Sequence, residues 1–208
     1  VCSILEITKT RRDKKAAGLC NLADIKNPHM AGVVSRSLIK YVSILKQHNY
    51  TIAIIKQSKT PENVGFVRKL ERIISPGTAL FDSCNDTDSP ELITVTVEKV
   101  HNIIYAGIGK TDLSTGKSFV CELTGMQSLY SWFNTCTPSE VLIYGDKPLR
   151  TMIKKHPRIS NCLVHEYVLS KENNNLNYFN HSLHHFYRNT GVITPVEYIG
   201  LDRYGIAV

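Results

Sequence analysis

Residues 30–78 read MAGVVSRSLIKYVSILKQHNYTIAIIKQSKTPENVGFVRKLERIISPGT, and this stretch decides the fold of the first part of the chain. Its first half has the periodicity of an amphipathic helix, and Ser35 or Ser37 can cap the N-terminus of that helix. The apolar side of the predicted helix carries Leu38, Ile39, Tyr41, Val42 and Leu45. We therefore expect a helix that packs one face against neighbouring elements.

The second half of the same stretch predicts two strands. Residues 51–55 form a short β-branched run that is typical of a buried strand, and residues 67–74 form a second strand-like run. Pro76 and Gly77 end the pattern, because proline and glycine together interrupt regular structure. A helix and two strands in this order predict a small mixed α/β unit over residues 1–80.

Positive charge is concentrated in this first unit. The chain of 208 residues has a formal net charge of +7, yet residues 1–80 contain 14 Lys and Arg against five Asp and Glu, a net charge of +9. Residues 81–208 contain 11 Lys and Arg against 13 Asp and Glu, a net charge of −2. A locally basic domain is the electrostatic signature of a protein that binds the phosphate backbone, although a solvated basic surface has the same composition.

A change in composition separates a second unit from the first. Residues 81–91 are acidic and rich in turn formers, which predicts a linker. Three strand-like runs follow, with Gly116 in the turn between the last two, and helical and strand-like segments then alternate. The predicted strands span 92–100, 103–111, 117–123, 141–144 and 162–168, and the predicted helices begin near Met126, Pro148 and Leu176. A three-stranded meander followed by such an alternation is the order of a ribonuclease-H-like fold.

Two segments of the chain resemble a known protein family. Residues 30–33 (Met-Ala-Gly-Val), Gln57 after its apolar run, Arg68, and residues 75–78 (Ser-Pro-Gly-Thr) have the order and spacing of the mismatch-reading domain of the MutS DNA mismatch repair proteins. Residues 112–116 (Asp-Leu-Ser-Thr-Gly) resemble a turn of the MutS connector domain. The resemblance is specific in these segments and rests on the element pattern alone after about residue 125.

The resemblance implies an α/β protein with two domains. Residues 1–80 would be a MutS-like mismatch-binding domain, residues 81–91 a linker, and residues 92–208 a ribonuclease-H-like connector domain, with both domains incomplete at their outer ends. The implied function is to bind duplex DNA at mispaired bases and to relay the signal to a downstream ATPase domain that uses ATP and Mg²⁺. The implied partner is mismatched double-stranded DNA, held by a homodimer that forms through C-terminal domains. We expect neither catalysis nor a cofactor in this segment itself.

A basic loop after Ile7 is the first candidate for contact with DNA. Cationic side chains on such a loop can each neutralise one phosphate with little sequence discrimination, and the resemblance implies this use in MutS proteins. A merely solvated loop is the alternative. The resemblance also implies that Arg68 faces DNA and that Met30 presses on the deformed minor groove, for which ordinary packing is the alternative. The loop residues are Lys9, Arg11, Arg12, Lys14 and Lys15.

The chain departs from the family pattern at points that bear on function. Val34 stands where the family usually has Pro, and Lys56 stands where it usually has Glu, which adds positive charge. The mismatch wedge of the family is a Phe-x-Glu motif, in which Phe intercalates at the mispair and Glu hydrogen-bonds a base. No Phe of this sequence has Glu two positions later. Mismatch reading is therefore implied by the resemblance and is not visible in these residues.

Two other functions stay open. Glu98 and Asp146 fit loosely where ribonuclease-H-like nucleases place metal-binding carboxylates, so a nuclease with a basic DNA-binding extension is one alternative. The predicted helix from Met126 to Cys136 supplies no further acid, which argues against this alternative. A MutS-like protein that binds DNA junctions without reading mismatches is the other.

Two motif-like groups favour ordinary structure over a ligand site. Residues 107–111 (Gly-Ile-Gly-Lys-Thr) end like a P-loop, but Ile104 replaces the first glycine and the segment reads as a strand. His181, His184 and His185 have helical spacing that could hold a metal ion. Because no Cys or acidic partner lies at ligand spacing, a polar helix face is the favoured interpretation.

Compartment is indicated only indirectly. No apolar run approaches the ~18 to 20 residues of a membrane span, so no membrane partner is expected. Six scattered Cys residues without a signal peptide favour reduced thiols inside a cell. The frequent Ile, Lys and Asn and the divergent motifs are similar to the mitochondrially encoded MutS of octocorals and its giant-virus relatives. That similarity implies a mitochondrial location.

Overall fold

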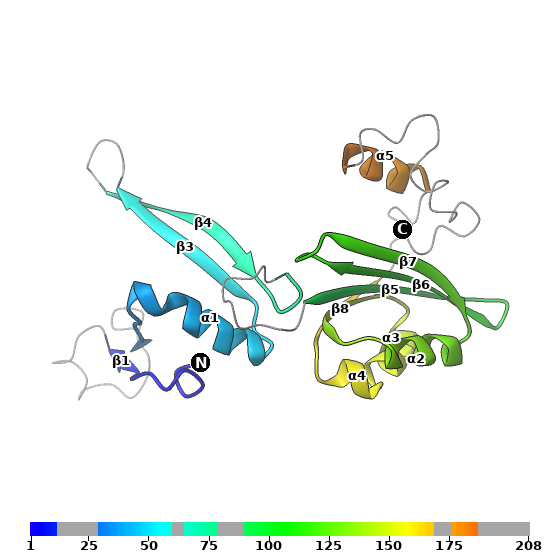
Figure 1. The fold of residues 1–208 in the computed structure, drawn as a ribbon, viewed down its shortest axis with the longest axis horizontal. Helices are drawn as coiled ribbons and strands as arrows, with labels where there is room; N and C mark the ends of the chain where they lie inside the picture. Colours follow the sequence, from blue (N-terminus) through cyan, green and yellow to red (C-terminus); the bar gives the residue numbers. More distant parts are fainter. Residues whose placement is uncertain (12–28, 60–64, 79–89, 169–175, 187–208) are drawn as a thin grey trace. The chain divides into compact units, whose positions relative to one another are not determined.

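The computed structural model describes residues 1–11, 29–59, 65–78, 90–168 and 176–186. The chain divides into two compact units, Val1–Ser75 and Pro76–Val208, and Figure 1 shows their elements. Residues 81–89 of the predicted linker lie outside the described residues.

The first unit is built around one helix and a long β-hairpin. A 3₁₀ turn, η2 (Ser35–Ser37), leads into helix α1 (Leu38–Gln47) with Ser37 as the N-cap residue, although no side-chain hydrogen bond caps the helix. Strands β3 (Ile52–Lys59) and β4 (Phe66–Ile74) then pair in antiparallel fashion (Figure 1). The predicted order of one helix and two strands is thus confirmed, with β3 four residues longer at its C-terminal end than predicted.

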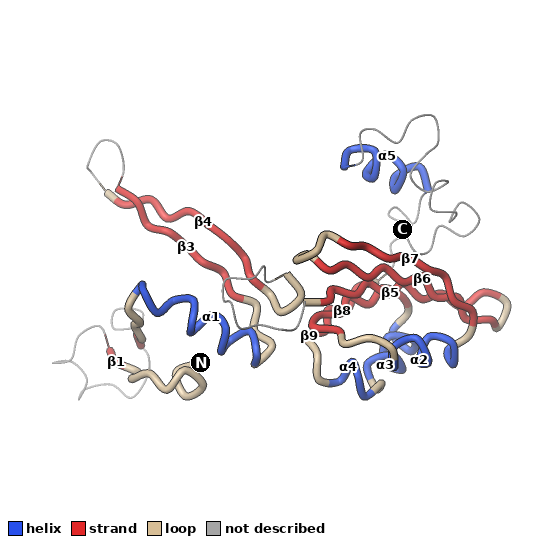
Figure 2. Tube along the Cα trace, in the orientation of Figure 1, coloured by secondary structure: helices blue, strands red, loops and turns tan. Residues whose placement is uncertain are grey.

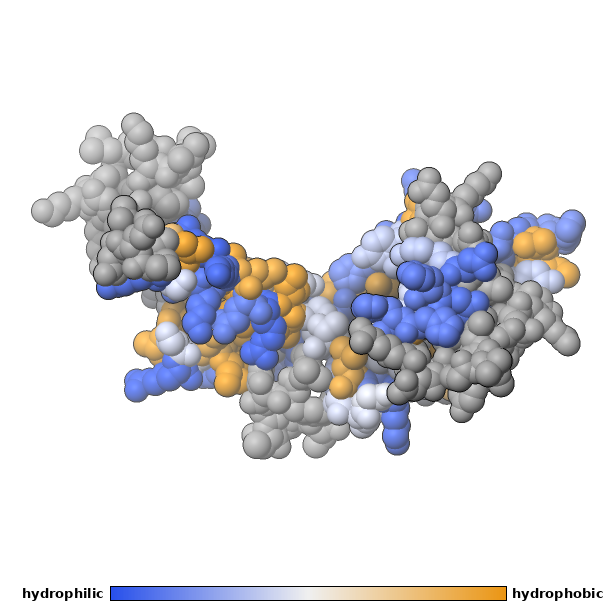
Figure 3. Space-filling view, turned by 90° about the horizontal axis from the view of Figure 1, so that it is seen from above, coloured by the Kyte–Doolittle hydropathy of each residue, from blue (hydrophilic) through white to orange (hydrophobic). Residues whose placement is uncertain are grey.

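The hairpin is more exposed than the sequence pattern predicts. Ile52 and Ile54 are half-buried. Ile55, the last residue of the apolar run, is 60% exposed. A buried strand was therefore the wrong expectation for one face of β3. Residues that pair across the hairpin lie on the same face of it. The face of Ile55 carries large exposed apolar side chains from both strands. They are Ile55 and its partner Leu70, Phe66 opposite Lys59, and Ile73 opposite Ala53. Figure 3 shows apolar surface on the first unit in orange.

A β-bulge interrupts the hairpin near its middle. Ile54 pairs with Arg72 whereas Ile55 pairs with Leu70, so Glu71 is an additional residue on β4. Such a residue bends the strand and increases its twist. Beyond the bulge, in the outer half of the hairpin, Lys56 lies opposite Lys69.

The second unit contains a mixed five-stranded sheet among the described residues, in the order β7-β6-β5-β8-β9. The first three strands along the chain form an antiparallel meander, and the last two run parallel to β5. The strands are β5 (Glu91–Val100), β6 (Ile103–Asp112), β7 (Lys117–Thr124), β8 (Pro138–Gly145) and β9 (Leu163–Tyr167). The predicted strands of the second unit are all confirmed to within a few residues.

Helices cover one face of this sheet, as Figure 2 shows. Alternate residues of the central strands, such as Ile93 and Val95, point to that face and are fully buried against Leu129, Phe133 and Ile153 of the helices. Alternation of buried and half-exposed residues along a strand is the signature of a sheet with one packed face. The helices are α2 (Met126–Asn134), α3 (Lys147–Lys154) and α4 (Pro157–Ser160), and a further helix, α5 (Leu176–Phe186), follows β9.

The predicted turn between β6 and β7 is confirmed in detail. Gly116 has φ +69°, a conformation that favours glycine. Asp112 accepts hydrogen bonds from the backbone N–H and hydroxyl of Ser114 and from the hydroxyl of Thr115. These bonds lower the pKa of Asp112 to about 2, with Ser114 as the largest contributor.

Gly77 anchors the start of the second unit. Its backbone N–H donates a hydrogen bond of 3.0 Å to the carboxylate of Glu140, whose other oxygen lies 2.9 Å from Nε2 of His165. Glu140 is 6% exposed, so this pairing satisfies a buried charged group. A Cβ on residue 77 would lie 2.6 Å from Cβ of Glu140, so only glycine fits this close approach without a shift.

Candidate nucleic-acid interface

A short ladder brings two of the predicted contact regions together. Strand β1 (Thr10–Arg11) pairs with β2 (His29–Met30), and Thr10 lies opposite Met30. The hydroxyl of Thr10 donates a hydrogen bond of 3.2 Å to the carbonyl oxygen of Met30. The start of the basic loop and Met30 are therefore neighbours, although they are 20 positions apart in sequence.

The side chains at this ladder are accessible where the structure describes them. Lys9, just before β1, is exposed, and Met30 is 49% exposed, which is more than interior packing would leave. Arg11 lies in β1, but its side chain is not described. Arg12, Lys14 and Lys15 lie outside the described residues.

Arg68 lies in the other sheet of the first unit, on strand β4. Its cross-strand partner is Gln57, and both residues are exposed. An exposed guanidinium beside an amide offers hydrogen-bond donors and acceptors to a polar ligand. The two residues that the sequence marks by resemblance thus share one face of the hairpin. The structure describes no pairing between this hairpin and the β1–β2 ladder.

The hairpin is strongly basic. Its described strands hold five cationic residues against one acid, Glu71, a net charge of +4. The Nζ atom of Lys56 lies 3.8 Å from a carboxylate oxygen of Glu71, and both side chains are more than half exposed. An exposed pair at this distance contributes little stability. The cationic residues are Lys56, Lys59, Arg68, Lys69 and Arg72.

Sequence reasoning missed one feature of this surface. Lys56 and Lys69 lie directly opposite each other across the hairpin. The sequence shows Lys56 as an additional positive charge, but the pairing depends on the hairpin register and on the bulge at Glu71. To predict it, one would have to align the two strand-like runs as an antiparallel pair, starting at the turn that connects them.

The nuclease alternative finds little support in the geometry of the second unit. Glu98 lies near the end of β5, and Asp146 is the N-cap residue of α3, directly after β8. Val97 pairs with Gly145, so Glu98 in β5 and Asp146 directly after β8 are the next residues along two neighbouring parallel strands. Within the described ranges, however, no three His, Cys, Asp or Glu residues are grouped so that they could hold a metal ion. That includes the described histidines of α5.

The P-loop-like segment is a strand. Residues 107–111 lie within β6, and Gly107 is buried. Nζ of Lys110 donates a hydrogen bond to a carboxylate oxygen of Glu91, which raises the pKa of Lys110. This lysine therefore pairs with a carboxylate of the neighbouring interior strand β5, and the segment is not a phosphate-binding loop.

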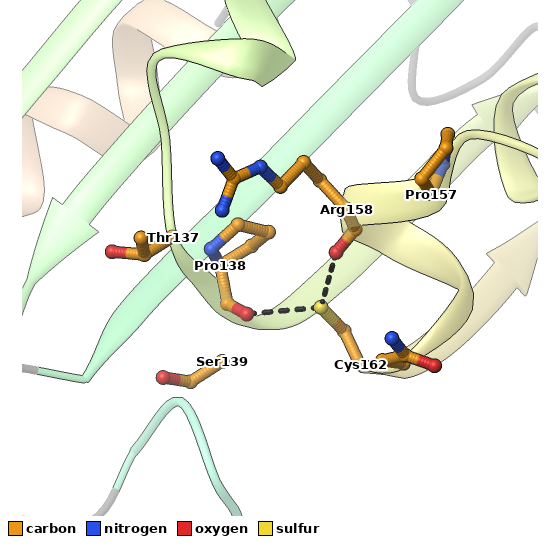
Figure 4. Close-up of a pocket in the computed structure, with 7 residues that line it drawn as sticks. Thr137, Pro138, Ser139, Pro157, Arg158 and Cys162 are labelled. Atoms are coloured by element: carbon orange, nitrogen blue, oxygen red, sulfur yellow. Dashed lines mark hydrogen bonds between the residues drawn. The ribbon is translucent and has the colours of Figure 1, made fainter.

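A cavity of about 410 Å³ opens beside α4 in the second unit (Figure 4). The single S–H of Cys162 can donate to the carbonyl oxygen of Pro138 or of Arg158, which lie 2.9 Å and 3.0 Å from its Sγ, and burial raises its pKa. A thiol whose pKa is raised stays protonated and is a poor nucleophile, so Cys162 has the character of a structural cysteine. Its lining residues are Thr137, Pro138, Ser139, Pro157, Arg158, Asn161 and Cys162.

Two further properties concern the described residues only. None of their helices has the length and apolar character needed to cross a lipid bilayer. The cysteines at positions 2, 121, 136 and 162 are free thiols in the described part of the chain.

Residues 2–83 match the family model described as MutS domain I. This matched region contains the β1–β2 ladder, helix α1 and the basic hairpin. It also includes Gly77, which packs within the second unit.

The chain is also similar to curated proteins named DNA mismatch repair protein MutS. It is 34% identical over 146 residues to that of Streptococcus thermophilus, an alignment that covers 69% of this chain and 16% of the relative. It is 29% identical over 166 residues to that of Lactobacillus acidophilus (77% of this chain, 18% of the relative). The protein of Lactococcus lactis is 29% identical over 173 residues (82% and 19%). The chain spans less than a fifth of the length of these relatives.

Proposed function

Because the chain belongs to the MutS family of DNA mismatch repair proteins and carries the domain I of that family, we propose that its first unit binds duplex DNA at mispaired bases. Domain I is the mismatch-recognition domain of MutS, and the match to residues 2–83 is the observation that carries this proposal. The net charge of +9 over residues 1–80 supports the DNA part independently, since phosphate neutralisation drives most of the affinity.

The described contacts fit this role at two places. Lys9 and Met30 lie at the β1–β2 ladder, where a cation can bind a phosphate beside an apolar side chain that can press on a groove. Arg68 is exposed on the hairpin with Gln57 beside it. Arg11, Arg12, Lys14 and Lys15 would add phosphate contacts next to the ladder.

The second unit is proposed to be a ribonuclease-H-like connector. Its meander followed by two parallel strands, with helices on one face, supports this assignment. The alignment of 173 residues with the Lactococcus lactis relative is longer than residues 2–83 can hold, so it must extend well into the second unit. In this role the unit performs no chemistry itself and transmits the DNA-bound state to a distant ATPase domain. That domain would use ATP and Mg²⁺, and the protein would act as a homodimer.

The mismatch proposal can be tested by charge reversal in the full-length protein. Arg68→Glu should weaken binding to a mispaired duplex at least tenfold, because it removes one phosphate contact and introduces repulsion. Lys99→Glu is the matched control, since Lys99 is also exposed but lies on β5 of the second unit. An equal loss of affinity in both variants would contradict a DNA contact that is specific to the first unit.

The junction-binding alternative predicts a different result for the unmodified protein. It would bind a four-way junction more tightly than a duplex with one mispair. A mismatch protein should show the opposite order at the same salt concentration, which a competition assay with the two DNA structures measures directly.

The mitochondrial, octocoral-like branch remains a separate proposal. It rests on residue composition and divergent motifs, and the bacterial relatives above do not bear on it. Members of that branch carry an HNH-type nuclease domain at the far C-terminus, so the downstream sequence of the parent gene tests it. An end without such a domain would contradict the branch but not the mismatch function.

A further inference from the structure

The outer half of the β3–β4 hairpin has an unusual charge arrangement. Lys56 and Lys69 are direct cross-strand partners, so their side chains leave the same face of the hairpin a short distance apart. Like charges in this position oppose pairing of the strands. Without a bound anion, the repulsion between the two lysines therefore destabilises the hairpin.

Little in the described structure compensates this repulsion. Glu71 lies 3.8 Å from Lys56, but it is the bulge residue and its side chain is 51% exposed. Lys69 has no carboxylate within salt-bridge distance among the described residues. No acidic residue occurs in the described outer strands, residues 55–59 and 66–70, whereas Lys59 and Arg68 add two further cations.

We propose that Lys56 and Lys69 form a phosphate clamp that binds two neighbouring phosphates of one DNA strand. The two lysines occupy directly opposite positions of the antiparallel pair, so their side chains start from one face of the hairpin, and both are exposed. An anion between or beside them removes the repulsion that the register imposes, so binding and folding of the hairpin support each other. This clamp rests on the proposed function, because its ligand is the backbone of the bound duplex.

The clamp is a different contact from Arg68. On each strand neighbouring residues point to opposite faces, so Lys69 and Arg68 cannot both lie on the same face of β4. Arg68 with Gln57 presents one face, and Lys56 with Lys69 presents the other. The hairpin therefore has two basic faces. The family resemblance points to the face of Arg68 and Gln57, and the clamp lies on the other face.

The test uses the full-length protein and a duplex of about 30 base pairs with one central mispair. Affinity is measured over a range of salt concentrations for the unmodified protein, for Lys56→Gln, for Lys69→Gln and for the double variant. Each single substitution should reduce the slope of log affinity against log salt by about one, and the double variant by about two. Lys99→Gln, which removes an exposed lysine of the second unit, should leave the slope unchanged.

Thermal unfolding without DNA separates lost contacts from lost structure. Lys69→Gln relieves the repulsion and breaks no ion pair of the described residues, so its unfolding midpoint should be equal to or above that of the unmodified protein. A lower midpoint would show that Lys69 stabilises the hairpin, and would overturn the clamp.

The outcomes also distinguish the clamp from the function on which it rests. Unchanged salt slopes in both variants, together with retained preference for the mispair, would overturn the clamp alone. Reduced slopes without any preference for the mispair would leave the clamp in place and overturn mismatch recognition. If the unmodified protein did not bind duplex DNA, both would be overturned.

Discussion

At the scale of single residues, the second unit depends on a few close contacts that a sequence pattern does not show. Gly77 approaches Glu140 so closely that a methyl group has no space, and His156 is buried beside aromatic rings while it caps a short helix. The sequence indicates that Gly77 belongs to the Ser-Pro-Gly-Thr segment and that His156 follows a predicted helix that begins near Pro148. Gly77 approaches Glu140, and the ring of His156 packs beside Tyr130 and Phe133, all of them more than 20 positions away, which explains why these contacts could not be predicted.

Gly77→Ala should destabilise the second unit by about 1 to 3 kcal/mol through overpacking. The added Cβ would lie 2.6 Å from Cβ of Glu140 and 3.1 Å from Cδ1 of Leu92. Denaturant unfolding measures the change. Gly109→Ala is the matched control, because its Cβ would meet Thr94 at 3.9 Å, an ordinary contact. Equal stability of the two variants would contradict the close approach at Gly77.

His156 should make stability fall as the pH is lowered. Burial, followed by the nearby charge of Arg158, lowers the pKa of His156 below its usual value of 6.5. Its neutral Nδ1 accepts a hydrogen bond from the backbone N–H of Arg158. His156 therefore binds a proton more readily in the unfolded state than in the folded state. Its contribution to the free energy of unfolding is complete above pH 6.5 and is lost as the pH falls toward the pKa of the folded state.

The measurement is the unfolding free energy as a function of pH for the unmodified chain and for His156→Gln. The difference between the two should shrink below pH 6.5 with a slope of at most about 1.4 kcal/mol per pH unit. A difference that stays constant from pH 8 to pH 5 would show that His156 does not titrate as its burial implies.

At the scale of elements, the sequence predicts position well and burial less well. The strands and helices of the second unit follow their hydrophobic patterns, because one face of each packs in a single core. The hairpin of the first unit is the exception. Its apolar residues predict a buried strand, but one face carries Ile55 and Leu70 about 60% exposed. Composition marks a residue as apolar, whereas burial depends on which element covers the face.

Phe133→Ala in helix α2 should cost about 3 to 5 kcal/mol, since the ring is fully buried between the helix and the sheet. Phe119→Ala is the control, because Phe119 lies on β7 of the same unit and is 50% exposed. We expect its cost to be well under half that of Phe133→Ala in denaturant unfolding. Similar costs would place the core of the unit elsewhere.

At the scale of the whole molecule, family membership could be predicted from short motifs, whereas the proposed DNA-binding surface could be predicted only in part. Lys9, Met30 and Arg68 are accessible as the resemblance implies. The Lys56–Lys69 pair needed the register of the hairpin. The basic loop residues 12–15 lie outside the described residues, so their contacts stay predictions.

A cleavage assay tests the nuclease alternative directly. Glu98 lies in β5 and Asp146 directly follows the neighbouring strand β8, but the described residues contain no group of three or more His, Cys, Asp or Glu that could hold a metal ion. Incubation of the 208-residue chain with duplex DNA and Mg²⁺ or Mn²⁺ should leave the DNA intact. Metal-dependent cleavage that disappears in Glu98→Gln would contradict this expectation and favour the nuclease alternative.

The central claim is that this chain is the mismatch-recognition part of a MutS protein. The most direct test compares the affinity of the full-length protein for two duplexes that differ only in one mispaired base, across a range of salt concentrations. The account predicts tighter binding to the mispaired duplex at every salt concentration, with similar salt slopes, because the phosphate contacts are shared and only the deformed site differs. Equal affinity for both duplexes at all salt concentrations would contradict mismatch recognition and leave backbone binding alone.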